Sequence, residues 1–70
     1  MKILIVVEAT STGFSAYAPE VPGCVATAAT TAEVETAMRE ALEFHFDSLR
    51  EDGGSAPTPT AYVTTVEIAA

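Results

Sequence analysis

Two residue types that commonly carry enzyme chemistry occur once each in this sequence. His45 is the only histidine and Cys24 the only cysteine among the 70 residues. Their separation in sequence does not test a nucleophilic pair, because such pairs form in space. A metal site at His45 would need a second ligand at a recognised spacing, and no HxxE, HExxH or Cys/His ligand pattern is present. We therefore interpret His45 as a buried or interface histidine and Cys24 as a small buried hydrophobic residue.

Carboxylates are the second group that could carry chemistry, and most of them fall in one segment. The sequence has ten acidic and three basic residues, which gives a formal net charge of -7. Seven of the acidic residues lie between positions 33 and 52, namely Glu33, Glu35, Glu40, Glu43, Asp47, Glu51 and Asp52. On a helix they form either a solvated face or a landing surface for a basic partner. A convex surface brings no carboxylates together in a cleft, so we expect no catalytic residue, no metal site and no cofactor.

The charge also decides between classes of partner. A nucleic acid requires clustered Lys and Arg, so direct nucleic-acid binding is not expected from this acidic chain. A basic protein is a better match. The candidate partner-binding residues are Glu40, Glu43, Asp47 and Glu51.

The segments that must position these residues begin with three short strands. Lys2–Ala9 is rich in Ile, Leu and Val and ends at a breaker cluster, residues 10–13. Phe14–Ala18 follows as a second strand, which the prolines and glycine of residues 19–23 terminate. Cys24–Ala28 is a third, short strand. The first two strands should form a hairpin.

A helix and a last strand complete the predicted fold. Thr30 and Glu33 form a capping box, so a helix begins at Thr31, and Gly53-Gly54 ends it. Its apolar stripe consists of Val34, Ala37, Met38, Ala41, Leu42, His45 and Leu49. After a proline-rich loop, Thr60–Ile68 reads as a strand. The predicted class is α+β, a small antiparallel sheet with one helix on one face, in the order β-β-β-α-β.

The small size of the chain predicts self-association. A chain of this length buries only about 60% of the surface that it exposes when unfolded. One helix covers one face of the sheet, which leaves Leu4 and Val6 on the opposite face without cover. Phe44 and Phe46, at the two edges of the helix stripe, would widen an apolar patch. We expect a homodimer or higher oligomer with Leu4, Val6, Phe44 and Phe46 at the interface.

Cysteine usage and the apolar segments indicate the compartment. A single cysteine excludes an internal disulfide. The apolar run of residues 3–7 is too short for a signal-peptide core or a membrane span. We expect a cytoplasmic protein with no membrane contact.

Several motifs in this order resemble the HicB-like antitoxin family of toxin-antitoxin systems, over nearly the whole chain. They are Gly13-Phe14 with Tyr17, the turn Pro19–Cys24, the Thr30 cap, the segment Glu40–Phe46 and the loop Pro57–Pro59. The resemblance implies a partial ribonuclease H fold without nuclease activity. It also implies an antitoxin that binds and neutralises a small basic HicA-type toxin, a protein that cleaves mRNA. A net charge of -7 fits that role.

Two other functions are consistent with the sequence. Many antitoxins of this kind continue into a C-terminal DNA-binding domain, whereas residues 1–70 are expected to form a single domain of the stand-alone form. Such a protein could instead be an oligomeric regulatory or structural protein without a toxin. An enzyme, which we do not expect, would use either Cys24 with His45 or a metal held by Glu8, on the first strand.

Overall fold

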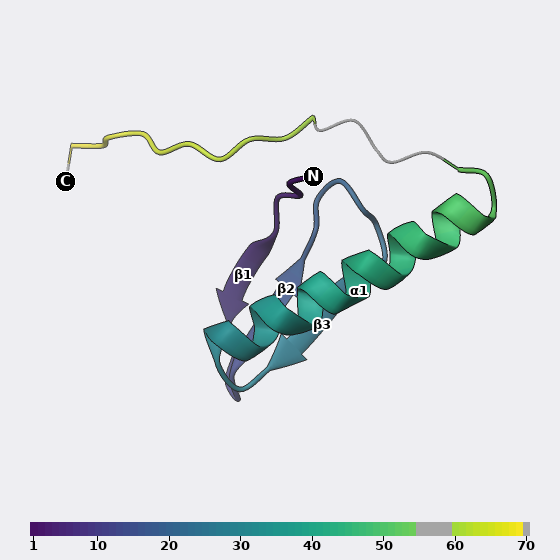
Figure 1. Cartoon of the computed structure of the whole chain (residues 1–70). Coiled ribbons are helices and arrows are strands. Elements are labelled where there is room, and N and C mark those ends of the chain that lie inside the picture. The colour runs from purple at the N-terminus through teal and green to yellow at the C-terminus, as the bar shows by residue number, and fades with distance from the viewer. Residues whose placement is uncertain (55–59, 70) are drawn as a thin grey trace.

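The computed structural model describes residues 1–54 and 60–69, which contain three strands and one helix (Figure 1). They are β1 (Val6–Ala9), β2 (Phe14–Tyr17), β3 (Val25–Ala28) and α1 (Thr31–Glu51). The strands form one antiparallel sheet in the order β1-β2-β3. Helix α1 lies across one face of this sheet and packs against β2 and β3. The predicted α+β class, with a three-stranded antiparallel sheet and one helix, is confirmed.

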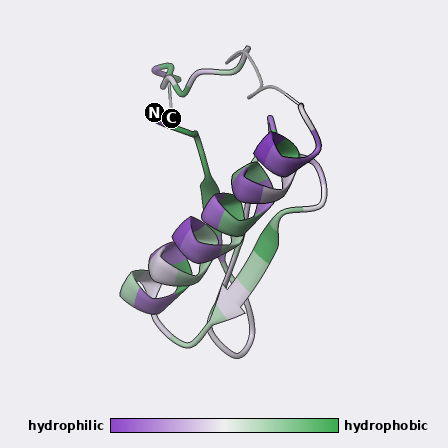
Figure 2. Ribbon diagram, turned by 45° about the vertical axis from the view of Figure 1, so that its right-hand side comes forward, coloured by the Kyte–Doolittle hydropathy of each residue, from purple (hydrophilic) through white to green (hydrophobic). Residues whose placement is uncertain are grey.

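Small side chains on the strands and larger ones on the helix build the core. Ala16 of β2 lies opposite Val7 of β1 and Ala26 of β3. Val34 and Met38 of α1 are completely buried. The buried core consists of Ala16, Ala18, Val21, Cys24, Val34, Met38 and Leu42. Figure 2 shows hydrophobic and hydrophilic residues alternating along α1, as expected for a helix with one buried side.

Local signals set both ends of α1 as predicted. The Thr30 hydroxyl accepts a hydrogen bond from the Glu33 backbone N–H at 3.2 Å. In a capping box the Glu33 carboxylate accepts from the Thr30 backbone N–H. Here it accepts instead from the Thr30 hydroxyl, which donates to Glu33 Oε1 at 2.8 Å. At the other end, Gly53 has φ +78°. The Gly54 N–H donates to the Leu49 carbonyl at 2.7 Å, which closes the helix in a Schellman motif.

The first three strands are shorter than predicted because pairing decides where a strand ends. β2 ends at Tyr17, which is the partner of Val6. Residues 2–5 therefore extend beyond the end of β2, and they have no ladder partner among the described residues. The predicted strand Lys2–Ala9 is thus reduced to Val6–Ala9.

The predicted strand over Thr60–Ile68 is wrong for the isolated chain. These residues are exposed and carry no strand pairing to any described residue. In Figure 1 they run past the N-terminus and away from the sheet. β-branched residues favour extended backbone, but a strand also needs an edge to pair with. The predicted fifth element and the likeness to a ribonuclease H fold are therefore not confirmed, and the predicted loop 55–59 lies outside the described residues.

Gly13 is required by the close approach of two backbone segments. A Cβ at this position would collide with the carbonyl oxygen of Ala28 and lie 3.0 Å from the Cα of Ala29. We expect Gly13→Ala to lower the free energy of unfolding by about 2–3 kcal/mol, because backbone has to move. Gly23→Ala is the matched control: its φ is +90° but no atom lies within 4 Å of the added Cβ. It should cost about 1 kcal/mol, from the strained φ alone. Urea unfolding at one fixed protein concentration measures both, and equal losses would contradict the steric argument.

The helix cap gives a second stability prediction. Thr30→Ala removes the acceptor for the Glu33 N–H and should lower the free energy of unfolding by about 1 kcal/mol. Thr31→Ala, one residue inside the exposed first turn, should change it by less than about 0.5 kcal/mol. Thermal unfolding followed by circular dichroism compares them. If the two variants were equally stable, the cap would have no measurable role.

Candidate functional site

The four acidic residues predicted to bind a partner lie together on the exposed side of α1, and we call them the acidic stripe. They are Glu40, Glu43, Asp47 and Glu51. Steps of three, four and four residues keep them within about 80° of the helix circumference. The buried residues Met38 and Leu42 project from the opposite side. The stripe is therefore accessible without any rearrangement of the core.

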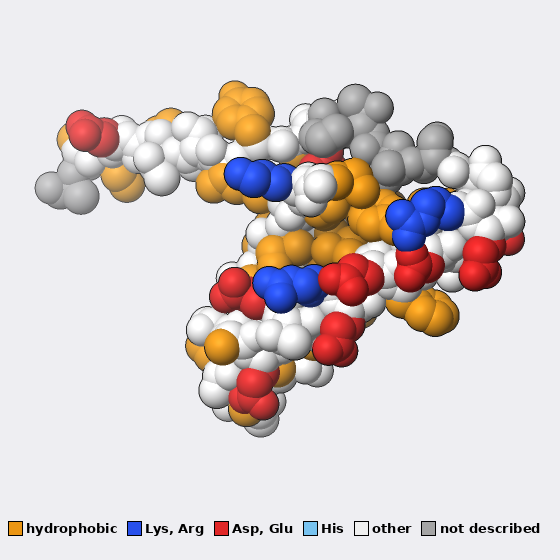
Figure 3. Space-filling view, in the orientation of Figure 1, with side chains coloured by type: hydrophobic (Ala, Val, Ile, Leu, Met, Phe, Trp, Pro, Cys, Tyr) orange, Lys and Arg blue, Asp and Glu red, His pale blue; other side chains and the backbone are white. Residues whose placement is uncertain are grey.

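Only part of the negative charge of the stripe is neutralised within the chain. In the described part of the chain, one ion pair is formed, between Arg50 and Asp47. Both side chains are mostly exposed, at 74% and 61%, so solvent screens the attraction and the pair adds little stability. Figure 3 shows acidic side chains spread along the exposed length of α1, with a few basic ones between them. The stripe thus keeps carboxylates that an incoming basic surface can contact.

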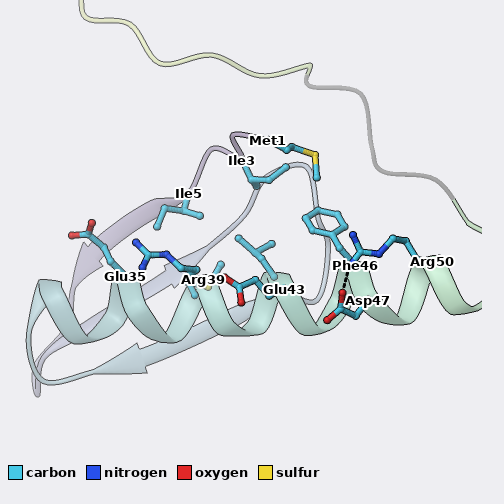
Figure 4. Close-up of a pocket in the computed structure, with 11 residues that line it drawn as sticks. Met1, Ile3, Ile5, Glu35, Arg39, Glu43, Phe46, Asp47 and Arg50 are labelled. Atoms are coloured by element: carbon cyan, nitrogen blue, oxygen red, sulfur yellow. Dashed lines mark hydrogen bonds and ion pairs between the residues drawn. The ribbon is translucent and has the colours of Figure 1, made fainter.

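A groove lies beside β1, between the N-terminal residues and α1 (Figure 4), and we call it the β1 groove. Its volume is about 640 Å³. Its apolar lining is formed by Met1, Ile3, Ile5, Met38, Leu42 and Phe46. Its charged lining is formed by Glu35, Arg39, Glu43, Asp47 and Arg50. Apolar residues surrounded by polar ones are typical of a surface that binds a protein or peptide.

The two single residues considered for catalysis line a second hollow, of about 570 Å³, beside β3. Cys24 is buried, and its thiol donates a weak hydrogen bond to the Ala41 carbonyl at 4.0 Å. The His45 ring is half-buried and packs edge-on against Phe46, with ring centroids 5.6 Å apart. No hydrogen bond joins Cys24 to His45 within residues 1–54 and 60–69. These contacts favour the packing roles over a nucleophilic pair.

The described residues contain no candidate metal centre either. Nowhere in the described residues do three or more His, Cys, Asp or Glu side chains gather to hold a metal ion. Glu8, the carboxylate considered for a nuclease, is exposed on β1 opposite Ser15.

The predicted interface residues do not form one patch. Val6 lies on the outer face of the sheet, and the alternation along the chain places Leu4 on that face too, because Ile3 and Ile5 pack against the core. Phe46 lines the β1 groove, whereas Phe44, 75% exposed, lies at the hollow beside β3.

Two residues missed by the sequence analysis extend the outer face. Val6 lies opposite Tyr17, and Tyr17 lies opposite Val25. Tyr17 and Val25 are exposed, at 43% and 66%. Alternation along each strand could have placed both on this face, but their alignment in one row depends on the register.

Helix α1, the helix in the described residues, is not both long and apolar enough to cross a bilayer.

Comparisons with known proteins identify the family of the chain. A search of curated proteins gives no match. Among solved structures, the chain is similar to one described as "HicA3 and HicB3 toxin-antitoxin complex", with 27% sequence identity and a TM-score of 0.64. The similarity covers 84% of this chain and 72% of that chain. The family model described as "HicB_like antitoxin of bacterial toxin-antitoxin system" matches residues 2–68. Since that match spans almost all of the sequence, the chain belongs to the HicB-like antitoxins of bacterial toxin-antitoxin systems.

Proposed function

We propose that this protein is a non-catalytic antitoxin that binds and neutralises a small basic HicA-type toxin in the cytoplasm. The observation that carries the proposal is the acidic stripe, exposed on α1 of a chain that belongs to an antitoxin family. The similar solved structure, described as a toxin-antitoxin complex, supports the same class of partner.

The acidic stripe is the proposed contact surface for the toxin. A toxin that cleaves mRNA needs a basic surface to hold phosphates. A row of carboxylates on an acidic chain attracts such a surface at a distance and competes with RNA for it. The stripe lies opposite the buried side of α1, so binding there leaves the core intact. The antitoxin would act by covering the basic surface of the toxin. It would not bind nucleic acid directly, because its negative charge repels phosphates.

A charge-reversal pair tests the site. Glu40→Lys with Glu51→Lys changes two stripe residues that do not line the β1 groove. We expect the association rate with the toxin to fall about tenfold or more at low salt, and its dependence on salt to flatten. Surface plasmon resonance over a salt series measures both effects.

The matched control reverses two exposed carboxylates outside α1, Glu8→Lys with Glu67→Lys. It makes the same change in net charge, so it separates the stripe from the overall charge of the chain. Equal slowing by both pairs of substitutions would show that the stripe is not the contact surface.

The toxin partnership itself has a separate test. Mixed with a HicA-type toxin from the same host, the purified protein should block RNA cleavage at a stoichiometric ratio, with recovery of cleavage at high salt. Cleavage that continues at full occupancy, or no complex at low salt, would contradict the antitoxin proposal. It would favour the alternative of an oligomeric regulatory or structural protein without a toxin.

A further inference from the structure

The C-terminal segment Thr60–Ile68, which we call the arm, exposes large apolar side chains that are not buried in the single chain. Four large hydrophobic residues are 72–84% exposed, namely Tyr62, Val63, Val66 and Ile68. Alternation along an extended chain puts Tyr62, Val66 and Ile68 on one side. The other side is more polar and includes Thr65 and Glu67. The arm therefore has the pattern of a strand with one face to bury.

The arm starts at the body of the molecule but lies away from the sheet of its own chain. The Thr60 N–H donates to the Glu20 carboxylate, in the connection between β2 and β3. From there the arm runs past the N-terminus and out of the body of the molecule (Figure 1). The radius of gyration is 14.2 Å, whereas a compact chain of this length has about 11 Å. The molecule is thus a small body with a projecting segment.

The β1 groove has the dimensions and the chemistry to receive such a segment. Among the described strands, β1 pairs only with β2, so its other edge is open, and residues 2–5 continue that edge. The groove follows α1 from Glu35 to Arg50, a rise of about 22 Å. About seven residues of extended chain span this length, and the arm supplies nine.

The hollow beside β3 fits the arm less well. Along α1 it extends only from Ala37 to Ser48, and it is lined by the apolar residues Cys24, Val25, Ala37, Ala41 and Phe44 and by the polar residues Glu40, His45 and Ser48. The β1 groove offers more long apolar side chains, namely Met1, Ile3, Ile5, Met38, Leu42 and Phe46. Tyr62, Val66 and Ile68, three bulky residues on one side of the arm, therefore match the lining of the β1 groove better.

We propose that the arm of one copy docks as a fourth strand on the β1 edge of a second copy, with Tyr62, Val66 and Ile68 in the β1 groove. Two copies related by a two-fold axis would each donate an arm and receive one, so both open edges and both apolar arms are used in a closed dimer. The outward course of the arm, which leaves the body of its own chain unpaired with any described strand, favours a second copy over docking within the same chain. The inference does not depend on the toxin and is tested on the purified full chain alone.

The mass of the protein in solution gives the first test. Sedimentation equilibrium should show two chains for the natural sequence. Val66→Asp with Ile68→Asp should reduce this to one chain, because charge enters the side of the arm that docks. Val63→Asp with Thr65→Asp adds the same charge to the opposite side and should leave the dimer in place. Circular dichroism confirms that α1 is folded in each variant. A monomeric natural protein, or a dimer that survives Val66→Asp with Ile68→Asp, would overturn the proposal.

A disulfide distinguishes exchange from docking within one chain. In a Cys24→Ser background, Ile5→Cys is combined in turn with Thr64→Cys, Val66→Cys and Ile68→Cys, which scans the register. Exchange predicts a disulfide between two chains in at least one combination, visible as a dimer on a non-reducing gel. A disulfide that forms only within one chain, or in no combination, would refute the exchange. Val25→Cys replaces Ile5→Cys as the control, and preferential cross-linking there would move the arm to the β3 edge and refute the β1 assignment.

Discussion

The contact between α1 and the small residues of β2 and β3 is the interaction on which the other features of this protein depend. Alanines at the centre of the strands let the helix approach closely, and Val34 and Met38 become completely buried there. The described part of the chain has only seven buried hydrophobic residues, so this contact forms most of its core. Dense packing is what makes so few residues sufficient for a small domain.

The same contact creates both candidate surfaces. Burying one side of α1 turns the opposite side, with the acidic stripe, to solvent. Because α1 packs over β2 and β3, the space beside β1 stays open as a groove. Glu43 and Asp47 belong to both surfaces. If the toxin contacts the stripe and an arm occupies the groove, the two binding events share these carboxylates, so each can change the affinity for the other.

The structural features that depend on neighbouring residues in the chain could be predicted from the sequence. Thr30 with Glu33, and Gly53 with Gly54, predicted both ends of α1, because capping involves a few adjacent residues. The stripe followed from helical spacing alone. Strand limits were less accurate, since β1 begins at Val6 only because β2 ends at Tyr17. The β1 groove was not predicted from the sequence, because it combines N-terminal residues with residues of α1 that are thirty or more positions away.

The arm shows why composition does not decide whether a segment is a strand. Its threonine and β-branched residues favour extended backbone, and the backbone is extended. A strand also requires hydrogen bonds to a neighbouring edge, and in the single chain the arm lies away from β1 and makes none with a described strand. An open edge and an unpaired apolar segment in one chain are each prone to non-specific association. A closed exchange between two copies pairs the open β1 edge and buries the apolar side of the arm at once, whereas covering only the edge or only the arm would leave the other exposed.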